Sequence, residues 1–333
     1  MTNIRIVEGS YKIRGKDTDM QGLVFPLVEE FKVGAAGGYV TVDGAAVNGF
    51  PDRNIKIKVA GPEGYEQVSE NVKTTNREES DAEIIERIRE RFDMLKDMTK
   101  AVKKGDVRAM IVSGPPGVGK SHGVEEVLDR YNTMQMLGGG QQFEVIKGAM
   151  SPIGLYCKLF KMADKGKVVV FDDCDSIFQD ELSLNILKAA LDSKKKRTIH
   201  WNTDSFKLRN EGVPDQFNFE ASAIFITNLK FDKVKGKLRE HLSALESRCH
   251  YMDLTIDTDK DKILRIKQVV ADGMLNNYKL SDEVKEDIMD FVDVNKNRLR
   301  ELSLRTVLKI SDLAIAFPTK WEAMAENTVM RRA

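Results

Sequence analysis

Apolar and polar residues follow one another along the middle of the chain in a pattern that predicts buried strands separated by helices. Short apolar runs that are typical of buried strands cover residues 109–113, 143–146, 168–172, 223–227 and 250–254. Apolar residues recur at helical spacing between them, over residues 120–135, 153–163 and 180–191. Because helices that alternate with continuous apolar strands cover both faces of a parallel sheet, the pattern predicts an α/β sandwich.

A helix is expected to lead into the first of these strands. Ser80-Asp81-Ala82-Glu83 has the residue types of a capping box, in which the Ser and Glu side chains satisfy each other's backbone N–H groups. Apolar residues behind it recur at helical spacing as far as Gly105.

The strand pattern ends after Cys249, and the rest of the chain reads as helical. Three helices are expected over residues 260–271, 281–292 and 302–315, with Ser281 as an N-cap and Pro318 as the stop of the last one. The sequence therefore predicts a small all-helical unit behind the sheet.

Residues 1–75 have a different pattern. Strict alternation occurs at residues 39–42 and 54–59, among many Gly, Val and Ala residues, without a continuous apolar period. Two interpretations remain open: a small β module, or a partly ordered arm that becomes fixed only on a partner.

Composition bears on the partners and the cellular location that we expect for the protein. Lys plus Arg and Asp plus Glu both number 52, so no global field favours nucleic acid or a membrane surface. Three scattered cysteines in 333 residues are typical of reduced thiols rather than a disulfide framework. Because the start carries no signal-peptide pattern and no apolar run approaches a membrane span, we expect a soluble, cytoplasmic protein without a membrane partner.

The strongest chemical motif lies directly behind the first strand of the sheet. Its residues are Gly114-Pro115-Pro116-Gly117-Val118-Gly119-Lys120-Ser121, with four residues between the first and last glycine. The glycines permit φ > 0 and close backbone approach, so that amide N–H groups wrap a phosphate at the start of a helix. Lys120 is expected to reach the β- and γ-phosphates and Ser121 to ligate Mg²⁺. His122 follows among the cofactor-binding positions and is expected to be structural rather than a catalytic base.

A second motif ends the third strand of the sheet. The run Val168-Val169-Val170-Phe171-Asp172-Asp173 places paired carboxylates after a buried strand. Asp172 suits a Mg²⁺ ligand, and Asp173 suits the group that orients or deprotonates an attacking water, with Asp175 a weaker candidate for either role. Taken alone, the same residues could simply cap the next helix.

Together these residues resemble an AAA+ ATPase, with Walker A at Gly114–Ser121 and Walker B at Val168–Asp173. The resemblance implies an αβα nucleotide-binding domain over residues 79–255, with a parallel sheet, and a helical lid domain over 256–318. It leaves residues 1–75 unexplained and 319–333 as a C-terminal tail. It also implies ATP and Mg²⁺ as cofactors. Walker B departs from the commoner pattern because its second carboxylate is Asp rather than Glu, which bears on the rate of hydrolysis.

The resemblance assigns two further catalytic positions within the chain. Asn228 ends the fourth strand, where sensor 1 helps to place the hydrolytic water, although Asn after a strand is also an ordinary turn residue. Arg305, in Ser303-Leu304-Arg305 at the start of the third lid helix, resembles sensor 2. Arg298 and Arg300 lie close by in the sequence, so the choice among the three rests on the resemblance.

Arg248 is the expected contribution of a neighbouring subunit. In AAA+ rings an Arg at the place of Leu245-Glu246-Ser247-Arg248-Cys249 reaches the γ-phosphate of the next subunit, and Ser-Arg-Cys resembles the clamp-loader form. A planar, permanently charged guanidinium suits the charge of the phosphoryl transition state. The alternative is a surface Arg paired with Glu246, with Arg239 as the fallback finger.

Two segments bear on the substrate. Residues 197–201 and 206–208 are expected to form a β-hairpin, which in some AAA+ proteins points into the pore. Lys194-Lys195-Lys196-Arg197 with Trp201 could bind phosphates and stack a base, or could be a solvated face. Residues 148–152 stand where many AAA+ proteins place a pore loop, but lack the aromatic grip of protein unfoldases.

The sequence thus predicts Mg²⁺-dependent ATP hydrolysis by a homo-oligomeric ring, most simply a hexamer, that remodels a protein or nucleoprotein complex. The alternatives are a clamp-loader-like replication ATPase, or a scaffold that ATP assembles and in which turnover is incidental.

Overall fold

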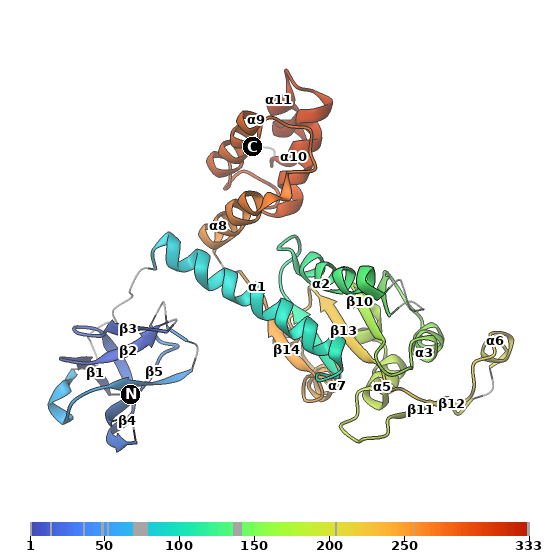
Figure 1. The fold of residues 1–333 in the computed structure, drawn as a ribbon, viewed down its shortest axis with the longest axis horizontal. Coiled ribbons are helices and arrows are strands. Elements are labelled where there is room, and N and C mark those ends of the chain that lie inside the picture. Colours follow the sequence, from blue (N-terminus) through green and yellow to red (C-terminus); the bar gives the residue numbers. More distant parts are fainter. Residues whose placement is uncertain are drawn as a thin grey trace. The chain divides into compact units, whose positions relative to one another are not determined.

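The computed structural model describes residues 2–13, 15–35, 37–47, 50–51, 53–68, 79–135, 142–203, 205–256 and 258–331. The chain forms two compact units, Met1–Ile84 and Ile85–Ala333 (Figure 1). The expected boundary between residues 75 and 79 falls largely outside the described residues.

The N-terminal unit is an antiparallel half-barrel with its own core. Its elements are β1 (Asn3–Ile6), β2 (Ser10–Ile13), β3 (Lys16–Asp19), β4 (Val24–Gly34), β5 (Gly37–Asp43), β6 (Asn54–Lys58), the short helix η1 (Pro62–Gly64) and β7 (Tyr65–Val68). Among the described residues the strands are ordered β3-β2-β6-β5-β4-β1-β7. Ile55 and Ile57 are buried and alternate with exposed residues, which is the period of a half-buried strand. Of the two interpretations left open above, the structure has the β module.

The second unit is built on a parallel sheet. Its strands are β8 (Ala109–Ser113), β9 (Phe143–Lys147), β10 (Val168–Asp172), β13 (Ser222–Thr227) and β14 (His250–Asp253). In the described part of the chain they are ordered β14-β8-β13-β10-β9, with every neighbouring pair parallel. The register pairs Thr227 with Ser113, and Asp172 with both Ile226 and Lys147. The carboxyl ends of the strands therefore meet at one edge, as the sequence predicts.

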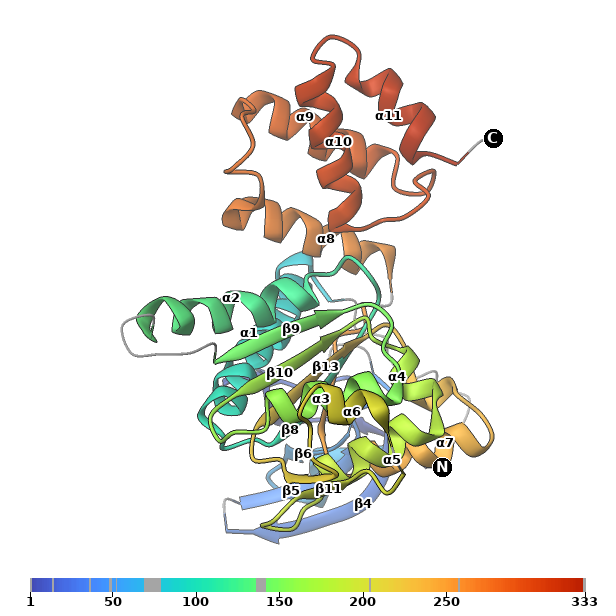
Figure 2. The ribbon, with the colours of Figure 1, turned by 90° about the vertical axis from the view of Figure 1, so that its right-hand side faces the viewer.

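Helices cover both faces of this sheet (Figure 2). They are α1 (Asp81–Lys104), α2 (Lys120–Gln135), α3 (Pro152–Lys161), α4 (Ser176–Gln179), α5 (Glu181–Ala190) and α7 (Lys237–Glu246), with the short η2 (Phe231–Lys233) between sheet and α7. The capping box of α1 is confirmed, because Ser80 N donates to Glu83 Oε2 at 3.0 Å and Glu83 N donates to Ser80 Oγ at 3.3 Å.

Alternation along the strands distributes their side chains between the two layers. Val169 and Phe171 face a core that α3, α5 and α7 complete, and Phe171 stacks on Phe225 with ring centroids 5.3 Å apart. The intervening Val168 and Val170, which are fully buried, point to the opposite face, where α1 and α2 lie (Figure 2). Each such side chain contributes about 1.5–3 kcal/mol on burial, which explains why the strands are continuous apolar runs.

The helical lid follows the sheet. It consists of α8 (Asp259–Val269), a π-helical turn η3 (Val270–Met274), α9 (Asp282–Val294), α10 (Leu304–Ala316) and α11 (Trp321–Val329). Ser281 is the N-cap of α9, as expected, since its side chain accepts from Val284 N. The segment after residue 318 packs on the lid, because Trp321 is buried with its ring centroid 5.5 Å from that of Phe291.

The segment between α5 and β13 differs from the expected hairpin. It holds β11 (Thr198–His200), α6 (Phe206–Asn210) and β12 (Gln216–Asn218), and β11 pairs with β12. The prediction of a strand at residues 206–208 is wrong, because Ser205 caps a helix there by accepting from Leu208 N at 3.4 Å. This helix buries Leu208 and leaves Phe206 exposed. The segment projects from the sheet domain in Figure 1.

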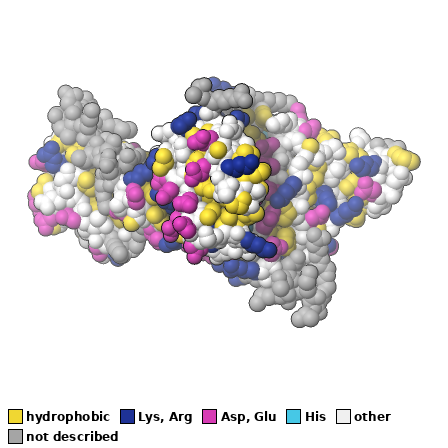
Figure 3. All heavy atoms as spheres, turned by 90° about the horizontal axis from the view of Figure 1, so that it is seen from above, with side chains coloured by type: hydrophobic (Ala, Val, Ile, Leu, Met, Phe, Trp, Pro, Cys, Tyr) yellow, Lys and Arg dark blue, Asp and Glu magenta, His cyan; other side chains and the backbone are white. Residues whose placement is uncertain are grey.

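No helix within the described ranges is long and apolar enough to span a membrane. In the view down onto the lid, Lys and Arg side chains are scattered over the surface rather than gathered into one patch (Figure 3). A nucleic-acid contact on this face would therefore have to be local.

Candidate nucleotide-binding site

The glycine loop joins β8 to α2 and lies against the lid. Gly117 and Gly119 have φ of 72° and 100°, in the left-handed region that glycine adopts without strain. A Cβ on Gly117 would stand 2.7 Å from the Cβ of Ser303, and Leu304 N donates to Gly117 O at 3.0 Å. The loop is therefore shaped by its glycines and fastened to the start of α10.

Lys120 is buried within this loop. Its Nζ donates to Gly114 O at 2.7 Å, to Pro115 O at 2.8 Å and to Asn228 Oδ1 at 2.8 Å. Burial lowers the pKa of Lys120 to about 8, against the opposing attraction of nearby Asp173. Because its three acceptors are neutral oxygens, the ammonium group would gain strongly from an anion placed in the loop.

Ser121 and Asp172 lie together at the end of the loop, as the metal prediction requires. Ser121 Oγ donates to Asp172 Oδ1 at 2.9 Å, and the Asp172 residue is 4% exposed. Hard oxygen donors of this kind are the ligands that Mg²⁺ prefers. The residues present therefore fit Mg²⁺.

Lys147 is a member of this site that the sequence reasoning missed. Its Nζ lies 3.3 Å from Asp172 Oδ2 and 2.9 Å from Glu125 Oε1, and its pairing with Glu125 raises the pKa of Lys147. Lys147 ends β9 and stands beside Asp172 in the sheet register. The alignment of strand ends could have indicated it, since the strand at 143–146 was expected.

Asp173 and Asn228 meet beside Lys120. Asn228 Nδ2 donates to Asp173 Oδ1 at 2.8 Å, while its own Oδ1 accepts from Lys120. Asp173 is the only non-glycine residue with positive φ in the described ranges, and its φ is 53°. Asp adopts this region more readily than most residues, and strained backbone of this kind clusters at functional sites.

Asp175, the weaker candidate, accepts a hydrogen bond from a residue outside this group. Thr227 Oγ1 donates to Asp175 Oδ1 at 2.6 Å, and burial raises the pKa of Asp175. The pair ties the end of β13 to the start of α4, which is a structural role.

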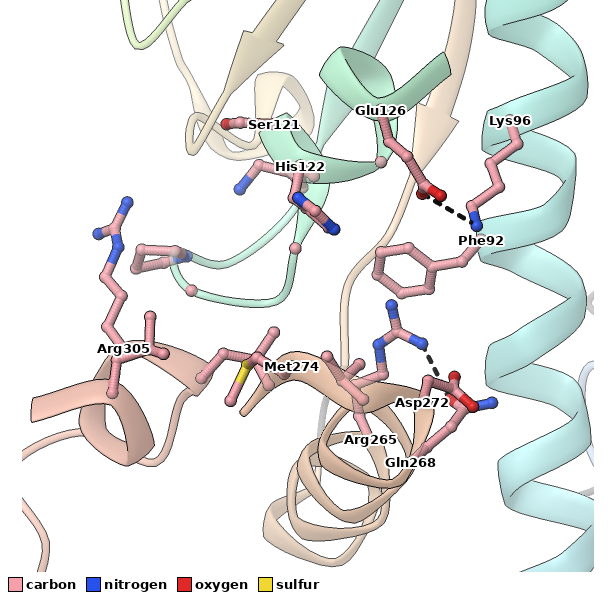
Figure 4. A pocket seen from close by; sticks show the side chains of 18 of the residues that line it. Phe92, Lys96, Ser121, His122, Glu126, Arg265, Gln268, Asp272, Met274 and Arg305 are labelled. Carbon is pink, nitrogen blue, oxygen red and sulfur yellow. Dashed lines mark hydrogen bonds and ion pairs between the residues drawn. The ribbon is translucent and has the colours of Figure 1, made fainter. Parts of the chain in front are cut away.

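A cleft of about 700 Å³ runs between the glycine loop, α1 and the lid (Figure 4). Nine of the residues that we expect to bind or act on the nucleotide line this cleft: Pro116, Gly117, Gly119, Lys120, Ser121, His122, Asp173, Asn228 and Arg305. Gly114, Pro115, Val118 and Asp172 belong to the loop or the strand end behind this lining. The structure thus brings together at one cleft the residues that the sequence predicts as Walker A, the second Walker B carboxylate, sensor 1 and sensor 2.

Arg248 lies at the end of α7 and does not line this cleft. Its Nη1 donates to Ala244 O at 2.6 Å, and no acidic side chain in the described ranges pairs with it. Glu246, the expected alternative partner, instead pairs with Arg239 Nη1 at 2.5 Å. Arg239 is therefore engaged in an ion pair with Glu246, whereas the guanidinium of Arg248 forms no ion pair with an acidic side chain in the described ranges.

The basic segment at residues 194–201 is only partly available to a ligand. Arg197 is 7% exposed and donates to the carbonyl oxygens of Ala190 and Ala221 at 3.1 and 3.0 Å, and burial lowers its pKa. Trp201 packs against the core with its ring centroid 5.5 Å from that of Tyr156. Of the two alternatives left open for this run, phosphate binding and a solvated face, Arg197 fits neither, because it is buried and its N–H groups donate to backbone carbonyl oxygens. Lys194, Lys195 and Lys196 remain on the surface.

Two further residues of the cleft carried no distinguishing sequence pattern. The Cζ of Arg265 lies 3.6 Å from the ring centroid of Phe92, so that α8 and α1 meet across the cleft (Figure 4). Both are single residues on helices that carry many charged and apolar positions.

The strand order, the glycine loop behind β8, the carboxylates behind β10 and the helical lid define an AAA+-type α/β fold. Similar solved structures include domain III of the Thermotoga maritima initiation protein DnaA, with a TM-score of 0.41, 10% identity and coverage of 72% of this chain and 92% of that one. They also include the Aeropyrum pernix Orc1 protein in complex with DNA, with a TM-score of 0.40 and 12% identity. That match covers 73% of this chain and spans 62% of the Orc1 chain.

In sequence, the chain is 35% identical over 260 residues to an uncharacterised 36.7 kDa protein from the nrdC-mobD intergenic region of Enterobacteria phage T4. The match covers 77% of this chain and 78% of the phage protein. The chain belongs to the family of that phage protein. No protein-family model matches it.

Proposed function

We propose that the chain is an ATPase that binds and hydrolyses ATP in the cleft beside the glycine loop. The observation that carries this proposal is the buried Lys120, which has only neutral acceptors and lies in one cleft with Asp173, Asn228 and Arg305. Such a site favours phosphate oxygens, because burial disfavours the ammonium group and an anion in the loop would offset that cost.

Each residue then has a chemical task. The amide groups of the loop and Lys120 hold the β- and γ-phosphates, and Ser121 with Asp172 would hold Mg²⁺, which neutralises charge on the phosphate oxygens. Asp173 accepts a proton from the water that attacks the γ-phosphorus, while the bond to the β–γ bridging oxygen breaks. Asn228 positions that water and is itself held by Lys120 and Asp173.

Two arginines complete the site in this proposal. Arg305 lines the cleft from the lid and balances charge on the γ-phosphate. Arg248 acts on the nucleotide of the next subunit in a homo-oligomeric ring, which we propose to be a hexamer. Two observations support this role of Arg248. Arg248 does not line the cleft of its own subunit, and no acidic side chain among the described residues pairs with its guanidinium.

The test of ATP binding and turnover is direct. Lys120→Ala is expected to abolish binding of ATP and of inorganic tripolyphosphate, measured by calorimetry. Asp173→Asn should bind ATP with an affinity close to that of the wild type but hydrolyse it about 10²- to 10⁴-fold more slowly. Wild-type protein that binds neither ligand, or Asp173→Asn protein with full turnover, would overturn the proposal.

The substrate of the ring is proposed to be a protein or nucleoprotein complex. Nucleic acid would be contacted through the exposed Lys194, Lys195 and Lys196. Single-stranded DNA should then stimulate the ATPase, and replacing the three lysines by alanine should remove the stimulation while leaving the basal rate unchanged. If DNA still stimulates the variant, DNA binds at another surface. If DNA does not stimulate the wild-type protein, a protein substrate is favoured.

A further inference from the structure

The guanidinium of Arg265, which lines the cleft, uses few of its hydrogen-bond donors. Its Nη1 donates to Gln268 Oε1 at 2.9 Å, and Gln268 is its only hydrogen-bond partner among the residues that the structure describes. The Nε atom is buried with no acceptor. A guanidinium carries five N–H donors, so most of those on Arg265 are unused.

The surroundings of Arg265 make this arrangement costly. Burial lowers its pKa to about 10, only partly opposed by the charges of Asp272 and Asp93. One face of the guanidinium lies over the ring of Phe92, with Cζ 3.6 Å from the centroid (Figure 4). An aromatic ring satisfies the charge in part but accepts no directional bond of full strength, so the free donors remain available to a ligand.

The position of this pair relative to the glycine loop indicates which part of a nucleotide it would meet. A Cβ on Gly119 would lie 3.7 Å from Arg265 Nη2 and 4.0 Å from Phe92 Cε1. The pair therefore borders the loop where α2 begins, in the same cleft as Lys120. With a triphosphate held in the loop, the sugar and base must occupy the remaining part of the cleft.

The lining of the cleft has the chemistry of a base site. Its apolar side chains include Phe92, Met274 and Leu308, and its polar groups include Gln268 and Asp272. The turn after α8, which kinks at Gly273 with φ of 103°, contributes Asp272 and Met274. An apolar slot with a few convergent polar groups suits a flat heteroaromatic ring with acceptors on its edge.

Building on the proposed function, we infer that Arg265 recognises the purine base of the bound nucleotide. Its free N–H groups donate to ring-nitrogen acceptors on the base edge, as arginine does with purine N7 in nucleic-acid complexes. The flat guanidinium, backed by Phe92, also offers a surface against which a base can stack. Arg265 is thus a specificity-determining residue of the site.

The test separates the base from the phosphates. Binding of AMP-PNP, GMP-PNP and inorganic tripolyphosphate is measured by calorimetry for wild type, Arg265→Met, Arg265→Lys and the control Arg298→Met. Arg298 is an exposed arginine of the same lid that does not line the cleft. Arg265→Met should weaken at least one purine analogue by about 10- to 100-fold and tripolyphosphate by less than twofold. Arg265→Lys should lose most of this affinity because it lacks the planar fork, and the control should match the wild type.

Equal weakening of tripolyphosphate and nucleotide would overturn the inference, because Arg265 would then be a phosphate ligand or a staple between lid and α1. Unchanged affinity for both purine analogues would overturn it as well. If Arg265→Met fails to fold, Phe92→Leu replaces it, with the same base-dependent loss expected. Failure of the proposed function is distinct, because wild-type protein would then bind none of the three ligands.

Discussion

At position 173 the backbone conformation, as well as the chemistry, favours Asp. With φ of 53°, Asp173 sits where Asp and Asn are favoured over longer side chains. The resemblance to AAA+ ATPases makes Glu the commoner residue at this position, and the backbone supplies a reason for Asp here.

We therefore expect Asp173→Glu to destabilise the protein by about 1 kcal/mol, because Glu gains less from the left-handed region. It should not raise the rate of hydrolysis. Asp173→Asn, which tolerates the same φ, is the control and should melt within about 1 °C of the wild type. Thermal unfolding decides the matter, and a Glu variant that is both as stable and more active would contradict this account.

In the proposed site Lys147 would compete with Mg²⁺ for Asp172, since its ammonium group lies 3.3 Å from Asp172 Oδ2. Its side chain is 60% exposed, so the pair contributes about 0.2–1 kcal/mol. Lys147→Met should lower the Mg²⁺ concentration needed for half-maximal ATPase about two- to fivefold. Lys158→Met, which breaks a pair with Glu144, serves as the matched control. A higher Mg²⁺ requirement in Lys147→Met would mean that Lys147 helps to hold the phosphates instead.

The thiols should be unreactive in the folded protein. Burial raises the pKa of Cys249 to about 12 and that of Cys174 to about 11, and it also raises that of Cys157. Because the neutral thiol is favoured below these values, little thiolate exists at pH 8. Ellman's reagent at pH 8 should modify the cysteines slowly until urea unfolds the chain. Fast reaction of Cys249 in native protein would show that the end of α7 is more open than described.

Among the elements, the contact between the glycine loop and α10 has the clearest consequence. Gly117→Ala places a Cβ 2.7 Å from Ser303 in addition to straining a φ of 72°, so the lid must move away. We expect nucleotide affinity to fall by at least tenfold and hydrogen exchange in α10 to rise. Gly166→Ala is the control, because its φ of 86° carries the same strain with no neighbour within 4 Å of the new Cβ. Equal effects of the two substitutions would rule out the lid contact.

The parallel sheet, its helices and the lid were predictable because each is specified locally. Continuous apolar runs such as that ending at Asp172 mark buried strands, and caps such as Ser80 and Ser281 mark helix starts. The glycine loop was predictable for the same reason, since consecutive residues build it.

The elements that the sequence did not predict depend on contacts between distant segments. Leu208 is buried by a short helix that a three-residue apolar pattern cannot distinguish from a strand. Arg197 stands at the end of a charge run, and only the fold shows that backbone carbonyl oxygens consume its donors. Arg265 and Phe92 are more than 170 positions apart, so their contact has no pattern in the sequence.

In the whole molecule, every residue that lines the nucleotide cleft belongs to the second compact unit. The N-terminal half-barrel has a separate apolar core that includes Phe25 and Ile57. The balanced net charge gives no long-range field to attract a nucleic acid, so binding of any such partner must depend on local groups.

In the proposed mechanism, ATP is hydrolysed at a site that Arg248 of a neighbouring subunit completes. Lys120→Ala protein has no working nucleotide site but keeps Arg248, whereas Arg248→Ala protein keeps the site and lacks the finger. Each should be nearly inactive alone, with loss of the finger lowering turnover by about 10³- to 10⁵-fold.

The most direct measurement is the ATPase rate of the two variants after mixing, with light scattering to establish that both enter one assembly. The mixture is expected to regain a substantial fraction of wild-type activity, because intact sites then face intact fingers. A mixed assembly no more active than its separate components, or full activity of Arg248→Ala alone, would contradict the shared site.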